Sequence, residues 1–122
     1  MIKGIGNDIL EIDRIKSAIK KNSRFLTKIY TKSELDYYQA KGEKIETLAG
    51  MFCAKEAVSK ALGTGFVSFA FTDIEILRAS GGKPYVLLHN KAKDALAELG
   101  GFNINISISH SKHYAHAVAI ID

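Results

Sequence analysis

Three side chains of the sequence have the types and the spacing needed to hold a diphosphate. Glu56 and Lys60 lie four residues apart in a segment with helical periodicity, so they point the same way from consecutive turns. Asp8 lies in a separate segment near the N-terminus. Two carboxylates from different elements suit Mg²⁺, which binds one or two carboxylates together with substrate phosphates, and an adjacent ammonium would bind phosphate. The simpler alternatives are a surface ion pair between Glu56 and Lys60 and a helix cap at Asp8.

Further candidate residues lie after this segment and near the C-terminus. The turn Gly63-Thr64-Gly65 supplies backbone amides and a hydroxyl, as phosphate sites often do, although Gly63 is also explained as a helix C-cap. His110 ends an alternating segment, where a histidine is either structural or a donor to an anionic ligand. Cys53 is the single cysteine, so no intrachain disulfide is possible, and we expect its side chain in the core.

The rest of the sequence predicts the elements that must position these residues. Alternation, helical periodicity and a capping-box pattern at Thr31 and Glu34 give the order β-α-α-α-β-β-α-β-β. We expect strands at 2–10, 71–79, 83–89, 104–109 and 114–121, and helices beginning at Ile12, at 31–39, at 45–62 and from an Asn90 cap to Leu99. The last strand is either the hairpin partner of the one before it or a bent continuation. This order predicts an α+β fold with the long helix packed on a largely antiparallel sheet.

Small residues indicate where these elements approach each other closely. Gly4, Gly6 and Asp8 share one face of the first strand, and two absent side chains leave room for a neighbour against the backbone. One side of the long helix is small and apolar, which predicts close packing on the sheet: Ala54, Ala57, Val58 and Ala61. The other half carries Phe52, Lys55, Glu56, Ser59 and Lys60.

Length and composition set the broad class. The chain of 122 residues is 47% hydrophobic and 25% charged, which predicts one folded domain over 1–122 and excludes a disordered chain. No apolar stretch approaches the ~18 residues of a membrane span, and the N-terminus lacks the apolar core of a signal peptide. We therefore expect a soluble, cytoplasmic protein with no membrane partner.

Positive charge is concentrated in one segment. The net charge is +4, and residues 14–28 carry six positive side chains and no acid. Such a surface favours a nucleic acid, a phosphorylated small molecule or an acidic protein, and charge alone does not choose among them. A nucleic-acid-binding domain is the alternative from a different class, but this segment has no interleaved aromatic residues and no recognised binding motif. A non-catalytic oligomer would leave the combination of Asp8, Glu56 and Lys60 unexplained.

Three segments together resemble one family. GIGNDILEIDRI at 4–15, AGMFCAKEAVSKALGTG at 49–65 and ISISHS at 106–111 are similar to the holo-acyl-carrier-protein synthases, which are small 4′-phosphopantetheinyl transferases. TKSEL at 31–35 and GGKPYV at 81–86 also fit, so the resemblance covers nearly the whole chain in order.

The resemblance implies an activity and a set of site residues. The activity is transfer of the phosphopantetheine arm from coenzyme A to a serine of acyl carrier protein, in support of fatty acid biosynthesis, leaving adenosine 3′,5′-bisphosphate. By matching positions, Asp8 and Glu56 would bind Mg²⁺ and Lys60 would neutralise phosphate, with Glu56 or a metal-bound water as the proton acceptor. The other positions expected around coenzyme A are Lys55, Ser59, Thr64, Gly65, Lys83, Pro84, His110 and Ser111.

The resemblance also implies partners. Acyl carrier proteins are acidic, and the exposed cations expected to dock one are Arg14, Lys20, Lys21, Arg24 and Lys28. Family members of this length form trimers with sites shared between neighbours, so we expect a homotrimer. Met51 stands where the family often has a basic residue, and Lys41 or Lys44 could take over that phosphate contact.

Overall fold

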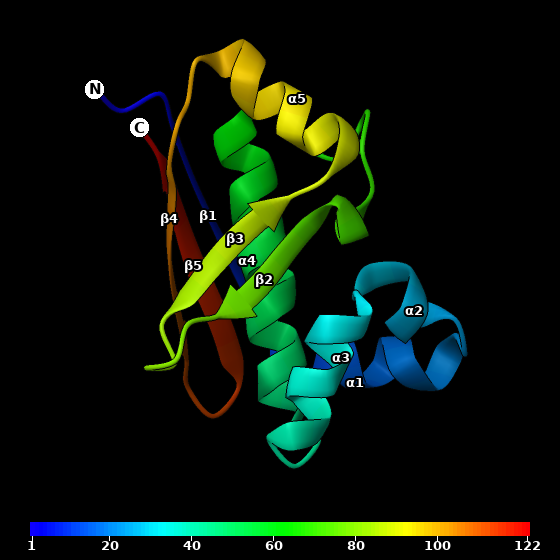
Figure 1. Cartoon of the computed structure of the whole chain (residues 1–122). Coiled ribbons are helices and arrows are strands. Elements are labelled where there is room, and N and C mark those ends of the chain that lie inside the picture. Colours follow the sequence, from blue (N-terminus) through cyan, green and yellow to red (C-terminus); the bar gives the residue numbers. More distant parts are fainter.

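The computed structural model describes all residues, 1–122, and has the predicted α+β composition. Five helices, one 3₁₀ turn and five strands follow one another along the chain (Figure 1). They are β1 (Gly4–Glu11), α1 (Ile12–Lys21), α2 (Phe25–Ile29), α3 (Lys32–Ala40), α4 (Ile45–Leu62), η1 (Phe71–Asp73), β2 (Ile74–Arg78), β3 (Pro84–Leu88), α5 (Asn90–Leu99), β4 (Ile104–His110) and β5 (Tyr114–Ile121). The order matches the prediction, with the short helix α2 as an addition.

Helix α4 lies at the centre of two antiparallel sheets. One sheet has the strand order β1-β5-β4, and the other is the β2–β3 hairpin. In Figure 1 the hairpin crosses in front of α4, and the three-stranded sheet lies behind it. The last strand is therefore the antiparallel hairpin partner of β4. The predicted packing of a long helix on an antiparallel sheet is confirmed, but the strands form two sheets.

The contact between β1 and α4 is unusually close because β1 carries glycines there. A Cβ atom added at Gly6 would collide with the carbonyl oxygen of Ala57, and one added at Gly4 would collide with that of Ala61. Ala57 and Ala61 are themselves buried. The neighbour predicted for the glycine face of the first strand is thus the small side of α4.

The half of α4 that faces away from the three-stranded sheet is also largely buried. Twelve of its 18 residues are buried, including the polar residues Lys55 and Ser59. The structure therefore places Lys55 between α4 and the layer formed by α3, η1 and β2, and buries Ser59 against its own helix, rather than leaving either at the surface. The periodicity of α4 predicted the helix face that packs on the three-stranded sheet. It did not predict that the opposite face would also be buried.

Two capping expectations are wrong. Asp8 does not cap a helix, because α1 begins only after Glu11 and Asp8 lies within β1. Asn90 is not an N-cap: it is the first residue of α5, has φ +52°, and its side-chain Nδ2 donates to Asp73 Oδ1 at 2.9 Å. The predicted capping box at Thr31 and Glu34 is confirmed, with both reciprocal hydrogen bonds present. None of the helices combines the length and apolarity that a membrane crossing requires.

Candidate active site

The carboxylate of Asp8 and the ammonium of Lys60 meet where β1 crosses α4. Lys60 Nζ lies 3.2 Å from Asp8 Oδ1 and also donates to the carbonyl oxygen of Asn7 at 3.0 Å. The Lys60 side chain is 54% exposed and that of Asp8 is 18% exposed, so solvent reaches the pair. The partner of Lys60 is therefore on β1, and the alternative of an ion pair with Glu56 is wrong.

Glu56 faces the same place from α4. Partial burial raises the pKa of the Glu56 carboxyl, the charge of Asp8 raises it further, and Lys60 acts in the opposite direction. Glu56 lies one turn before Lys60 on α4, and Lys60 Nζ contacts Asp8 Oδ1, so the Glu56 carboxylate is on the side of the helix that faces Asp8. Nowhere in the chain are three or more acidic, histidine or cysteine side chains placed to hold a metal ion by themselves. Two carboxylates could bind a hard divalent cation such as Mg²⁺. The ion would take its remaining oxygen ligands from the substrate and from water.

Cys53 lies beneath these carboxylates and is not a nucleophile. Its side chain is fully buried and its thiol contacts the carbonyl oxygen of Ala115 at 3.5 Å. Burial, followed by the negative charge of Asp8, raises the pKa of Cys53 to about 12, so the thiol stays protonated at neutral pH. Its expected place in the core is confirmed.

The Gly63–Gly65 turn follows the helix that carries Glu56 and Lys60. Gly63 ends α4 in the left-handed conformation at φ +88°, and its N–H donates to the carbonyl oxygen of Lys60, which confirms the predicted C-cap. Gly65 also has a positive φ, +61°, and donates to the carbonyl oxygen of Ser59 at 3.3 Å. Thr64 between them is exposed. The turn thus presents its hydroxyl to solvent within four residues of Lys60.

Lys55 and Ser59 have their polar atoms engaged inside the protein. Lys55 Nζ lies 2.8 Å from Glu34 Oε1, and the Ser59 hydroxyl donates to the carbonyl oxygen of Glu56 at 2.7 Å. Burial lowers the pKa of Lys55, and the charge of Glu34 opposes that shift. Neither residue lies at the surface where Asp8, Glu56 and Lys60 converge.

A second polar region lies across the three-stranded sheet from Asp8. His110 ends β4, which is separated from β1 by β5, so the two strands are about 10 Å apart. His110 lines a pocket of about 290 Å³ together with Lys44, Thr47 and Arg78. Within one chain, the structure therefore does not bring His110 to the Asp8 carboxylate.

Arg78 is a pocket residue that the sequence interpretation missed. Its guanidinium lies 5.0 Å from the ring centroid of Tyr37, and its Nε is buried with no hydrogen-bond partner. In the sequence, Arg78 is only an arginine at the end of a predicted strand, before the Gly81-Gly82 turn. That position does not indicate a ligand site unless the pocket is known. Met51, by contrast, is fully buried, and the cationic side chains of the pocket are Lys44 and Arg78.

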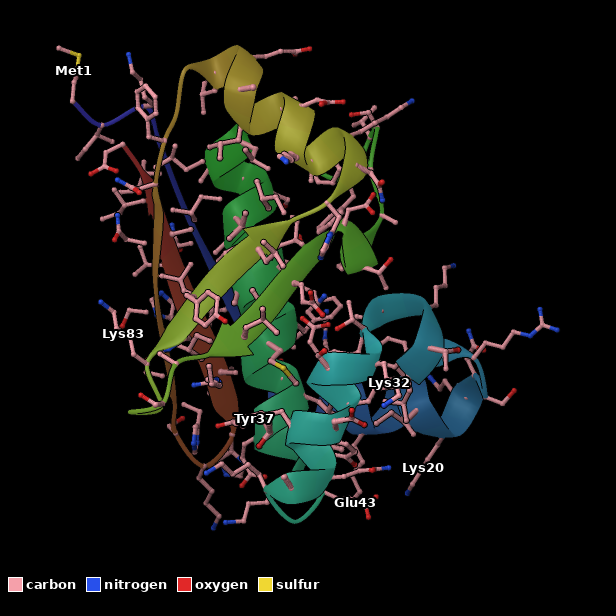
Figure 2. All side chains as sticks on the ribbon, in the orientation of Figure 1. Met1, Lys20, Lys32, Tyr37, Glu43 and Lys83 are labelled. Carbon is pink, nitrogen blue, oxygen red and sulfur yellow. The ribbon has the colours of Figure 1, made fainter.

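The remaining candidates lie in exposed turns. Lys83 precedes β3 at the tip of the hairpin, and Ser111 follows β4. In Figure 2, Lys83 and Lys20 lie on opposite sides of the molecule. The candidate residues for the metal and for coenzyme A thus form two groups, one where α4 meets β1 and one at the turns around the β4 edge. The carrier-docking candidates on α1, such as Lys20, lie apart from the second group.

The fold and the paired carboxylates define a small α+β protein suited to an anionic, phosphate-containing ligand. Comparison with known proteins gives the family: the chain belongs to the 4′-phosphopantetheinyl transferase superfamily, which matches residues 4–119. The resemblance noted from the sequence motifs is confirmed.

Individual relatives match over nearly their full length. The holo-[acyl-carrier-protein] synthase of Fusobacterium nucleatum is 53% identical over 122 residues, covering 99% of both chains. That of Alkaliphilus oremlandii is 53% identical over 120 residues, covering 98% of both. Among solved structures, the synthase of Neisseria meningitidis superposes with a TM-score of 0.92 at 33% identity, covering 100% of this chain and 99% of the other. The Helicobacter pylori synthase in complex with coenzyme A gives 0.86 at 32% identity, covering 97% and 99%.

Proposed function

We propose that the protein transfers the 4′-phosphopantetheine group of coenzyme A to a serine of apo-acyl carrier protein. The observation that carries the proposal is the convergence of Asp8 from β1 with Glu56 and Lys60 from α4. Relatives that share about half of their residues are holo-[acyl-carrier-protein] synthases, and one solved relative holds coenzyme A. The product would support fatty acid biosynthesis in the cytoplasm.

The reaction is a phosphoryl-type transfer with one bond formed and one broken. The serine oxygen bonds to the β-phosphorus of coenzyme A, and the bond from that phosphorus to the bridging oxygen breaks. Adenosine 3′,5′-bisphosphate leaves with the electron pair, and the serine proton passes to Glu56 or to a water molecule. Such transfers depend mainly on positioning and on neutralising charge, and Lys60 is placed to supply a positive charge where the diphosphate would lie.

Asp8 and Glu56 are the residues that would hold Mg²⁺. Bound there, the ion would polarise the diphosphate and stabilise negative charge on the leaving group. The protein's own part would be to hold the two carboxylates on facing elements, and the close approach of β1 to α4 at Gly4 and Gly6 supports this.

Coenzyme A would be bound by both groups of candidates. Thr64 and Gly65 lie on the turn that follows α4, four and five residues after Lys60, and they would contact the diphosphate. The second group would contact the nucleotide, and it consists of Lys83, Pro84, His110 and Ser111 with Lys44 and Arg78. Lys44 and Arg78 would supply the positive charge that Met51 lacks.

We propose a homotrimer because it would bring the two groups together. One face of the β1-β5-β4 sheet has no cover, and Ile5 and Ile9 on it are 64% and 65% exposed. Val118 and Ile120 extend this apolar surface on β5. Burying it against neighbouring copies would be favourable, and would place the β4 edge of one chain near Asp8 of the next.

Helix α1 and the segment after it would dock the acidic carrier protein. All six cations there are exposed and none makes an ion pair. The five that we expect to contact the carrier are Arg14, Lys20, Lys21, Arg24 and Lys28. Arg14 lines a groove with Leu10 and Glu11 at the end of β1, the strand that carries Asp8. A carrier protein bound there would reach the site.

The proposal is tested by mass spectrometry. The protein is incubated with coenzyme A, apo-acyl carrier protein and Mg²⁺, and the carrier is expected to gain the mass of the arm. Omission of coenzyme A, and the Glu56→Gln variant, serve as controls. A competent carrier that gains no mass with the wild-type protein contradicts the proposed function.

A further inference from the structure

Lys55 is a lysine whose side chain is entirely inside the protein. Its ammonium makes three contacts, to Glu34 Oε1 at 2.8 Å and to the carbonyl oxygens of Ile74 at 2.7 Å and Phe71 at 3.0 Å. These occupy all three of its donors, so none is left for a ligand.

Glu34 completes the network on the other side. Its Oε1 also accepts from the N–H of Thr31 at 2.8 Å, and its Oε2 accepts from the N–H of Ile76 at 2.7 Å. The pair therefore joins α3, α4, η1 and β2 at one point. A buried lysine and a buried glutamate with every polar atom satisfied hold the surrounding backbone in one arrangement.

One of these contacts leads to the Gly63–Gly65 turn. Phe71, whose carbonyl oxygen Lys55 holds, stacks its ring on Phe66 with centroids 3.9 Å apart, and on Phe52 of α4 at 5.3 Å. Phe66 directly follows Gly65 in the chain. Residues 66–69 make no backbone–backbone hydrogen bond, so side-chain packing holds this part of the loop: the aromatic contacts of Phe66 and the burial of Phe69 in the core.

We propose that Lys55 is a positioning residue for the coenzyme A site. By fixing the backbone at Phe71, its ammonium fixes the ring on which Phe66 stacks, and so holds Thr64 and Gly65 in the turn that follows α4. The proposal rests on the proposed function, because it assumes that the turn contacts coenzyme A.

The test removes both charges at once, so that no unpaired charge is left buried. In the Lys55→Met/Glu34→Gln variant we expect the KM for coenzyme A to rise about tenfold or more, because small displacements of binding groups weaken positioning. The KM for carrier protein should stay unchanged, and amide hydrogen exchange should accelerate at residues 64–70. Leu96→Ala, which truncates a side chain of α5 at Gly101 and Ile121, is the matched control for general destabilisation.

A second variant covers the case in which the double variant does not fold. Phe66→Ala leaves the buried pair intact and removes the link to the turn, and it should give the same selective rise in the KM for coenzyme A. An unchanged KM for coenzyme A in a folded variant, or equal changes in both KM values as in a merely structural role, overturns the proposal. Absence of transfer by the wild-type protein would instead contradict the proposed function, and exchange at 64–70 would still decide the positioning role.

Discussion

Replacing Gly6 by alanine is expected to damage both stability and activity. The added Cβ would overlap the carbonyl oxygen of Ala57 and lie 2.7 Å from the backbone nitrogen of Ala61. Because the obstacle is helix backbone, β1 would have to retreat by about 1 Å. Overpacking of this kind costs about 1–3 kcal/mol or more, which should lower the unfolding midpoint by roughly 4–12 °C for a chain of this length.

The same displacement reaches the site, because Asp8 is two residues from Gly6 on the same face of β1. A misplacement of about 1 Å can cost about 10²-fold in rate, so we expect a loss of that order in kcat for the folded Gly6→Ala protein. Gly4→Ala meets an equivalent obstacle at Ala61 but lies farther from Asp8, so its effect on stability should be similar and its effect on kcat smaller.

The measurements are thermal unfolding and initial transfer rates at saturating coenzyme A. Gly81→Ala is the control, because nothing lies within 4 Å of its added Cβ and its backbone has no positive φ. A Gly6→Ala protein with the unfolding midpoint and rate of Gly81→Ala would refute the argument that glycine is needed for the β1–α4 approach.

Three further predictions concern charge. Asp8→Asn and Glu56→Gln should each lower kcat by about 10²-fold or more with little change in unfolding midpoint, and full activity in either would remove that residue from the proposed metal site. Arg14→Glu with Arg24→Glu should raise the KM for carrier protein but spare that for coenzyme A, with an effect that shrinks as salt increases; equal damage to both KM values would contradict docking on α1. Burial alone would raise the pKa of Glu75, but hydrogen bonds from Thr31 and His89 and nearby positive charge lower it overall. Its carboxylate therefore contributes stability above the unfolded pKa of about 4.3 that is lost as pH falls through the folded value. Urea unfolding of Glu75→Gln should show a weaker decline over that acidic range, and an unchanged decline would contradict this role.

Local chemistry made much of the β1–α4 contact predictable. Gly4 and Gly6 on one strand face and the alanines of the long helix were matched surfaces, and Gly63 had the residue type that a helix C-cap favours. These features depend either on residues that are close in the sequence or on the side-chain period of a single helix or strand. The sequence therefore predicted where Asp8 would face, although not that Lys60 would be its partner.

The buried network was not predictable because Glu34 already had a complete local explanation. The capping box accounts for its presence at the third position of α3. Nothing in the local pattern shows that the same carboxylate also accepts from Ile76, 42 residues later, and pairs with Lys55. Arg78 was missed for a similar reason, since its meaning depends on a pocket completed by residues of α3, α4 and β4.

The two lysines of α4 show why residue type and motif position do not fix a role. Lys55 and Lys60 are five residues apart, so they point about 140° away from each other around the helix. That rotation places Lys60 at the sheet edge with a 54% exposed side chain, and places Lys55 under the second layer with none of its side chain exposed. An ammonium that solvent reaches can exchange Asp8 for a phosphate at modest cost, whereas Lys55 could reach a phosphate only by leaving Glu34 buried and unpaired. In the proposed function, the same helix therefore supplies one lysine for the ligand and one for the framework that holds the site.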